Sequence, residues 1–88
     1  MTYHPSPNAV FTEMEDDEGI LLHLQTRMYF SLNETGTLIW KLLQEGRDVD
    51  DIASALKQAY DVGHASALQH VGVFLDELAQ DGLVDKKK

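Results

Sequence analysis

Apolar and polar residues alternate along the first part of the chain. In residues 27–32, apolar side chains recur at every second position, which is the period of a strand with one buried face. A second apolar run, 20–24, ends two residues earlier, and this short gap predicts a β-hairpin, although Gln25 and Thr26 are not favoured turn formers. Strand-forming residues in 9–14 add an earlier strand.

The three predicted strands follow one another as a meander. In a meander the third strand, 27–32, lies at an edge of the sheet, where one row of backbone N–H and C=O groups has no partner. We therefore expect an open strand edge unless another part of the chain covers it.

After the strands, the apolar spacing changes to that of helices. Asn33 is a typical helix cap, and apolar residues then recur three and four positions apart until Gly46. A second helix is expected from Asp48, whose side chain can accept a hydrogen bond from the N–H of Asp51. A third helix is predicted for about 64–80, and a glycine follows it.

This order of elements predicts the fold class. Three strands followed by three helices indicate an α+β domain of the winged helix-turn-helix kind, with a three-stranded antiparallel sheet followed by three helices. The 88 residues leave room for one domain, which we expect to span 9–85. Residues 1–8 contain two prolines and predict a flexible N-terminal arm, and the lysines at 86–88 predict a flexible basic tail.

The composition narrows the function. The absence of cysteine excludes disulfides, thiolate zinc sites and cysteine nucleophiles. Fifteen acidic and seven basic residues give a net charge of −8, which repels nucleic acid phosphates and anionic lipid headgroups. No apolar run suits a signal peptide or a membrane span. We therefore expect a soluble, cytoplasmic protein with no nucleic acid and no membrane among its partners.

Residues suited to catalysis or metal binding are scattered. His4 lies in the predicted arm and His23 in a strand, while His64 and His70 diverge by about 120° around the third helix. The paired acidic residues are explained by a turn and a helix start. The chain has no phosphate-binding glycine loop and no triad spacing. We therefore expect no enzymatic activity, no catalytic residue, no metal ion and no cofactor.

A winged-helix fold raises the alternative of DNA binding, in which the third helix would enter the major groove. Residues 58–85 contain no lysine or arginine, and an acidic helix would be repelled by the phosphate backbone. A DNA-binding winged-helix protein is thus the weakest alternative.

The open strand edge beside the third helix is the remaining candidate site. When the apolar stripe of this helix faces the core, one flank is left, consisting of Ala67, His70, Phe74 and Glu77. Phe74 would either close the core or form the floor of a groove, and Tyr29 would be either a contact residue or an ordinary exposed strand residue. The combination favours binding of an extended peptide as a fourth strand.

The sequence also resembles the PqqD-like peptide recognition elements, which serve pathways that make ribosomally produced, post-translationally modified peptides. The resemblance covers about 10–84. Its strongest part is the run Arg27-Met28-Tyr29-Phe30-Ser31-Leu32-Asn33, followed by Thr35-Gly36, Ile39-Trp40, Leu42-Leu43 and Gly46. The second half continues it with Ile52, Leu56, Tyr60, Val71, Phe74-Leu75, Leu78 and Gly82-Leu83-Val84.

Within that family, the chain is most similar to the stand-alone recognition proteins of lasso-peptide biosynthesis. The resemblance implies that it binds a precursor leader peptide by strand addition and presents it to a cysteine protease, doing no chemistry itself. Together with the reasoning above, this gives the expected peptide-binding residues: Arg27, Met28, Tyr29, Phe30, Ser31, Ala67, His70, Val71, Phe74, Glu77 and Leu78. Family members often have an acidic residue where this chain has His70. A peptide chaperone for a radical SAM enzyme is the main alternative.

Overall fold

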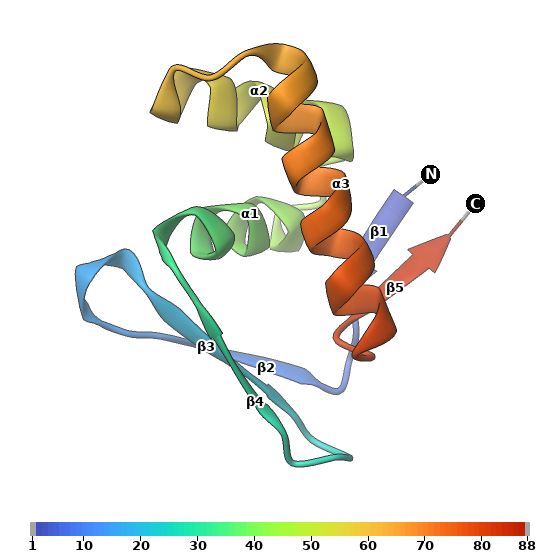
Figure 1. Ribbon diagram of the computed structural model, residues 1–88. Helices are drawn as coiled ribbons and strands as arrows, with labels where there is room; N and C mark the ends of the chain where they lie inside the picture. The colour runs from blue at the N-terminus through green and yellow to red at the C-terminus, as the bar shows by residue number, and fades with distance from the viewer. Residues whose placement is uncertain (1, 88) are drawn as a thin grey trace.

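The computed structural model describes residues 2–87 and shows a sheet and a helical layer (Figure 1). In chain order the elements are β1 (Thr2–Pro5), β2 (Ala9–Glu13), the 3₁₀ turn η1 (Glu15–Asp17), β3 (Gly19–His23), β4 (Tyr29–Leu32), α1 (Glu34–Gln44), α2 (Val49–Tyr60), α3 (His64–Gln80) and β5 (Val84–Lys87). The predicted α+β fold, a three-stranded antiparallel sheet followed by three helices, is confirmed.

The register of the sheet explains which strand face is buried. The strands lie in the order β2-β3-β4, and Leu21 of β3 stands opposite Phe11 of β2 and Phe30 of β4. Along β3, buried residues alternate with half-buried ones, and Leu21 is fully buried. One face of the sheet therefore packs on the helices, and the other faces away from them.

His23 builds the turn between β3 and β4. Its Nδ1 accepts hydrogen bonds from the backbone N–H of Gln25, at 3.1 Å, and of Thr26, at 3.3 Å. Its carbonyl oxygen accepts from the N–H of Arg27, which has a positive φ of 64°. The hairpin forms without favoured turn formers because a buried imidazole supplies the acceptor that a turn residue would otherwise provide.

The start of β4 differs from the prediction. The strand begins at Tyr29, because Arg27 and Met28 belong to the turn. The alternation placed Met28 on the buried face, but its side chain is 56% exposed. Periodicity overextended the strand by two residues, since the turn already bends the chain at Arg27.

The helix ends agree with the capping predictions. Asn33 Oδ1 accepts from the N–H of Gly36 at 2.8 Å, and Asp48 Oδ1 accepts from the N–H of Asp51 at 2.9 Å. Gly46 follows α1 with a φ of 89°, a left-handed conformation that favours glycine. These local signals are confirmed, and Asn33 fixes where β4 passes into α1.

The core lies between the sheet and the helices. Its largest fully buried side chains are Trp40, Leu21, Ile39, Ile52, Leu75, Leu83 and Val71. Phe11 of β2 packs against Trp40 of α1, with ring centroids 6.5 Å apart. The sheet is therefore anchored on α1 by aromatic packing, which holds β4 next to the helices.

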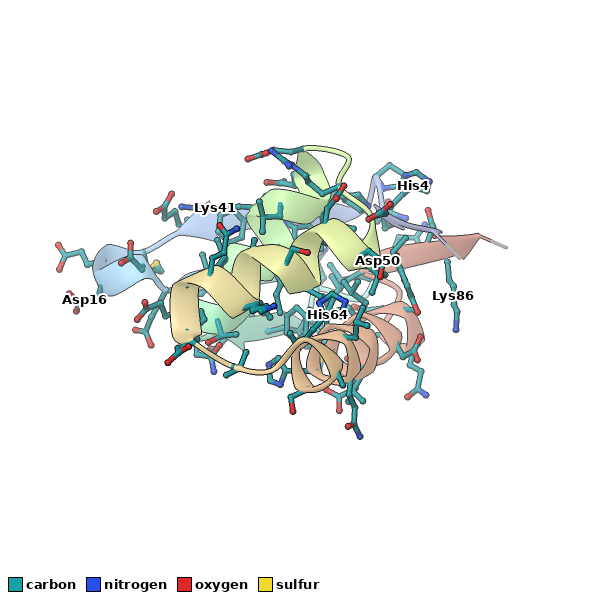
Figure 2. All side chains as sticks on the ribbon, turned by 90° about the horizontal axis from the view of Figure 1, so that it is seen from above. His4, Asp16, Lys41, Asp50, His64 and Lys86 are labelled. Carbon is teal, nitrogen blue, oxygen red and sulfur yellow. The ribbon has the colours of Figure 1, made fainter. Side chains whose placement is uncertain are left out.

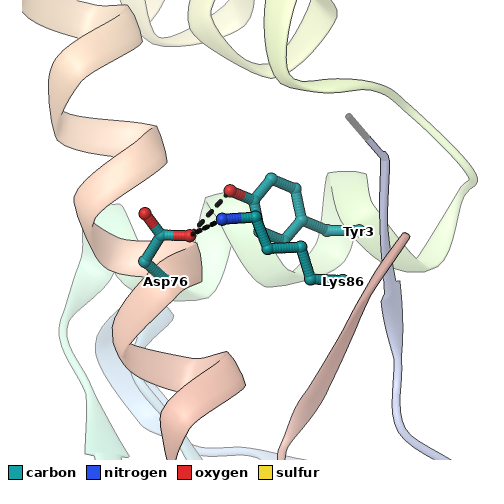
Figure 3. A network of polar contacts seen from close by, with 3 residues as sticks. All are labelled: Tyr3, Asp76 and Lys86. Carbon is teal, nitrogen blue, oxygen red and sulfur yellow. Dashed lines mark hydrogen bonds and ion pairs between the residues drawn. The ribbon is translucent and has the colours of Figure 1, made fainter. Parts of the chain in front are cut away.

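The two ends of the chain pair with each other, which corrects the expectation of a free arm and a free tail. β1 and β5 form an antiparallel ribbon, with Tyr3 opposite Lys86 (Figure 3). The Tyr3 hydroxyl donates to Asp76 Oδ1 at 2.8 Å, and Lys86 Nζ lies 3.0 Å from the same oxygen. The buried Tyr3 ring and this polar network order both ends, and positions 1 and 88 lie outside the described residues.

Candidate functional site

The outer edge of β4 is unpaired within residues 2–87, because β3 is its only strand neighbour there. The N–H of His23 donates to the carbonyl of Met28, which sets the hydrogen-bonding phase of the hairpin. In an antiparallel ladder, alternate residues then bond to the partner strand. Phe30 and Leu32 therefore bond toward β3, while the N–H and C=O groups of Tyr29 and Ser31 point to the free side.

A hollow lies beside this edge, between β4, the start of α1, and α3. Its volume is about 370 Å³, and we call it the strand-side hollow; its lining residues are Glu18, Ser31, Leu32, Asn33, Gly36, His70 and Phe74. The structure thus brings together three of the predicted site residues, Ser31, His70 and Phe74. Glu18 and Gly36 were missed by sequence reasoning, because nothing in their local pattern places them opposite α3.

Phe74 has both of the roles that the sequence left open. Its ring is half-buried and packs against the hydrophobic core, and it also lines the strand-side hollow. Gly36 of α1 leaves the space that the ring occupies, since a Cβ there would lie 3.2 Å from two of its carbons. The wall of the hollow is therefore continuous with the core, which makes it a preformed surface.

A second hollow adjoins the first along α3. It has a volume of about 350 Å³, and we call it the helix-side hollow; it is lined by Thr35, Leu56, Tyr60, Val62, Ser66, Ala67 and His70. Its walls are mainly apolar, and His70 is shared by the two hollows. A peptide that pairs with β4 would find side-chain space on both sides of this histidine.

The remaining predicted residues occupy three kinds of place. Val71 and Leu78 are buried in the core and support α3 from behind, and Ala67 is almost fully buried under the helix-side hollow. Glu77 is exposed on α3 but lines neither hollow. Phe30 is half-buried, against the core. The turn residues Arg27 and Met28 and the strand residue Tyr29 are exposed beside the open edge.

The charge around the hollows is sparse and acidic. Neither lysine nor arginine lines either hollow among the described residues, and Glu18 is the carboxylate of the strand-side hollow. Tyr60 borders the helix-side hollow, and its hydroxyl donates to Glu34 at 3.3 Å. His70 contributes the imidazole that the walls of both hollows share.

The structure offers no constellation for metal binding in the described part of the chain. Groups of three or more histidines or acids placed to hold an ion are absent from residues 2–87. Figure 2 shows His4 on the terminal ribbon and His64 at the start of α3. In the same range, none of the helices has the length and apolar character needed to cross a membrane.

Comparison with known proteins identifies the family. The family described as coenzyme PQQ synthesis protein D (PqqD) matches residues 18–84. The structure "TbiB1 in Complex with the TbiA(beta) Leader Peptide" is similar over 97% of this chain and 98% of that chain, with a TM-score of 0.90 and 35% identity. A second structure, "Lasso peptide synthetase B1 complexed with the leader peptide", shares the fold over 98% and 100% of the two chains, with a TM-score of 0.88 and 23% identity.

No curated protein matches the chain. The family match covers most of the chain, from β3 to the start of β5. It agrees with the resemblance noted at the junction of β4 and α1. The chain therefore belongs to the PqqD family.

Proposed function

We propose that this protein is a leader-peptide-binding adaptor of lasso-peptide biosynthesis. The observation that carries the proposal is the open edge of β4 beside a hollow walled by Phe74 and His70. TbiB1, which is 35% identical over nearly the whole chain, forms a complex with a leader peptide. This similarity supports the choice of a leader peptide as the ligand.

The affinity would come from backbone pairing. Tyr29 and Ser31 each offer one N–H and one C=O to a guest strand, and each hydrogen bond formed contributes about 0.5–1.5 kcal/mol net. Such pairing accepts many sequences, because it uses backbone atoms. Selectivity would come from the guest side chains that enter the two hollows.

The adaptor would perform no chemistry and would present the bound leader to a cysteine protease. A surface for that enzyme is available on the outer face of the sheet. There the register aligns Val10, Leu22 and Tyr29 in one row, and Tyr29 is 71% exposed. Exposed apolar residues of this kind mark protein interaction surfaces. Because the row adjoins the β4 edge, the enzyme would lie next to the guest strand.

The proposal is tested by binding measurements on an edge variant. Ser31→Pro removes an outward N–H that β3 does not use, so the sheet should form while strand addition is blocked. Calorimetry with the TbiA(beta) leader, and with peptides selected from a displayed random library, should show loss of binding. Glu13→Pro is the matched control, because it places proline at the outer edge of β2 and removes only an exposed ion pair.

Two results would count against strand addition. One is wild-type protein that binds neither the TbiA(beta) leader nor any library peptide. The other is Ser31→Pro that binds as tightly as Glu13→Pro. Amide exchange supplies an independent readout, since the N–H groups of Tyr29 and Ser31 should become protected only when peptide is bound.

A peptide chaperone for a radical SAM enzyme is the second candidate, because the matching family is named for coenzyme PQQ synthesis and not for lasso peptides. Both functions use the same groove and differ in the enzyme that receives the peptide. Co-purification with a purified leader protease or with a radical SAM enzyme, in the presence of bound peptide, separates them. If the peptide-bound protein forms a complex with the radical SAM enzyme and not with the protease, the radical SAM enzyme takes the place of the protease as the proposed partner.

A further inference from the structure

We propose that His70 is a specificity-determining residue that favours an acidic guest residue over a basic one. The inference rests on the proposed function, because it concerns the peptide that occupies the β4 groove. It states which kind of guest residue is preferred beside His70.

The position of His70 supports this role. It is the residue shared by the strand-side and helix-side hollows. It lies one turn before Phe74 and three residues after Ala67, on the flank of α3 that faces the groove. Its side chain is exposed and has no hydrogen-bond partner among the described residues. A guest that uses both hollows must therefore place a residue beside the imidazole.

The other titratable groups that line the two hollows are a carboxylate and a phenol. Glu18 faces it across the strand-side hollow, and Tyr60 is the titratable group of the helix-side hollow. Glu77 lies farther along the same flank of α3 and lines neither hollow. Of the described residues that line the two hollows, none is a lysine or arginine. A guest carboxylate here would therefore find its basic partner in His70, besides neutral donors such as Ser31 and Ser66.

The chemistry of imidazole gives the direction of the preference. A neutral ring offers one donor and one acceptor, whereas the protonated ring offers two donors and a positive charge. A hydrogen bond between a charged ring and a carboxylate is shorter and stronger than a neutral one. A guest lysine at the same place would be repelled by the charged ring. The Glu18 carboxylate repels an acidic guest residue. The measured preference is therefore the attraction by His70 less the repulsion by Glu18.

The experiment is a charge scan of a peptide that the wild-type protein selects from a displayed random library. Each position is changed in turn to Glu, Gln and Lys, and the affinity of each peptide is measured by calorimetry. At one position, Glu should bind about threefold to tenfold more tightly than Lys. His70→Gln should remove this preference, His70→Glu should reverse it, and Glu18→Gln should enlarge it.

Gln69→Glu is the matched control, because it adds the charge of an acidic residue to an exposed neighbouring position that lines neither hollow. It should leave the preference at the selected guest position as in the wild type. A Glu-over-Lys preference that persists in His70→Gln overturns the inference while leaving the adaptor function intact. A wild-type protein that selects no peptide overturns both. Thermal melts of each variant confirm that the compared proteins are folded.

Discussion

The ring of Phe74 on α3 lies directly against Gly36 on α1. A Cβ at Gly36 would come within 3.2 Å of Cε1 and Cζ of that ring, closer than an ordinary van der Waals contact. Gly36 also donates its N–H to Asn33, the cap at the end of β4. At the start of α1, Gly36 therefore contacts both the cap that follows β4 and the aromatic wall of the groove.

Gly36→Ala should weaken peptide binding without unfolding the domain. Alanine in a helix is about 1 kcal/mol more favourable than glycine, but the methyl group must push the Phe74 ring toward the strand-side hollow. The two effects oppose each other in stability, whereas the displaced ring narrows the groove. We expect a free energy of unfolding within about 1 kcal/mol of wild type and a lower leader affinity, measured by denaturation and calorimetry.

Gly72→Ala is the control for this prediction. Gly72 lies in α3, and nothing stands within 4 Å of the Cβ that alanine would add. It should raise the free energy of unfolding by about 0.5–1 kcal/mol and leave the affinity unchanged. Equal affinities of the two variants would contradict the role given to the contact between Gly36 and Phe74.

Phe74→Ala should lower both stability and peptide affinity. A fully buried aromatic side chain contributes about 1.5–3 kcal/mol by burial. The Phe74 ring is half-buried in the free protein, so part of this stabilisation is gained only when a peptide covers the ring. We expect losses of about 1 kcal/mol or more in unfolding and in binding, from thermal denaturation and from calorimetry with a synthetic leader. Unchanged affinity together with reduced stability would show that the ring serves the core alone.

Local sequence signals predicted the junction that carries the groove. The caps Asn33 and Asp48 act within three residues of themselves, so a short window contains all the information they need. The edge position of β4 likewise followed from the order of strands. The open edge, and the flank of α3 that faces it, were therefore accessible before any coordinates.

Long-range pairing was not accessible in the same way. Tyr3 and Asp76 are 73 positions apart, and a short strand of mixed composition gives no sign of its partner. The periodicity of α3 placed Val71 and Leu78 on the face toward the core, where they are buried, whereas the family resemblance implied that they are contact residues. Helical spacing defines a face, while neighbouring elements decide its exposure.

His23→Leu should destabilise the hairpin that presents β4. The substitution places an apolar side chain at a buried position and removes the Nδ1 acceptor used by the N–H groups of Gln25 and Thr26. Because Gln25 and Thr26 are exposed and water can satisfy their N–H groups, losing each hydrogen bond costs about 0.5–1.5 kcal/mol net. We expect a lower free energy of unfolding and faster amide exchange at both positions.

Leu24→Ala provides the comparison for His23→Leu, since Leu24 is the exposed neighbour of the histidine. It should change stability little and leave the two amides protected. Slow exchange of Gln25 and Thr26 in His23→Leu would show that the turn is held by other contacts.

Peptide binding should depend only modestly on salt. Backbone hydrogen bonds and apolar hollows are screened less than exposed ion pairs, whose interactions weaken beyond a Debye length of about 8 Å at physiological ionic strength. Calorimetric titrations of a leader at increasing sodium chloride should give a shallow slope. A steep fall in affinity would indicate a partner attracted chiefly by the net charge of −8.

The network of Tyr3, Asp76 and Lys86 should make stability fall at both extremes of pH. The hydrogen bond from Tyr3, followed by that from Lys86, lowers the pKa of Asp76 below its usual 3.8. The unfolded chain then binds the proton first, so the stabilisation is present above pH 3.8 and is lost as the pH falls through the folded value. Burial, with a smaller effect of Asp76, raises the pKa of Tyr3 above 10.0, and that contribution is lost as the pH rises through the folded value.

Asp76→Asn tests this linkage through denaturant midpoints measured across the pH range. The denaturant midpoint of this variant should fall less steeply at acidic pH than that of wild type, because asparagine does not titrate. Asp81→Asn, which changes an exposed residue at the end of α3, should retain the wild-type dependence at acidic pH. Tyr3→Phe keeps the buried ring while removing the phenol, and its midpoint should fall less steeply at alkaline pH. If the midpoint falls as steeply at acidic pH in Asp76→Asn as in Asp81→Asn, other carboxylates set the acid sensitivity. The terminal ribbon would then be held by its backbone pairing and by the Tyr3 ring.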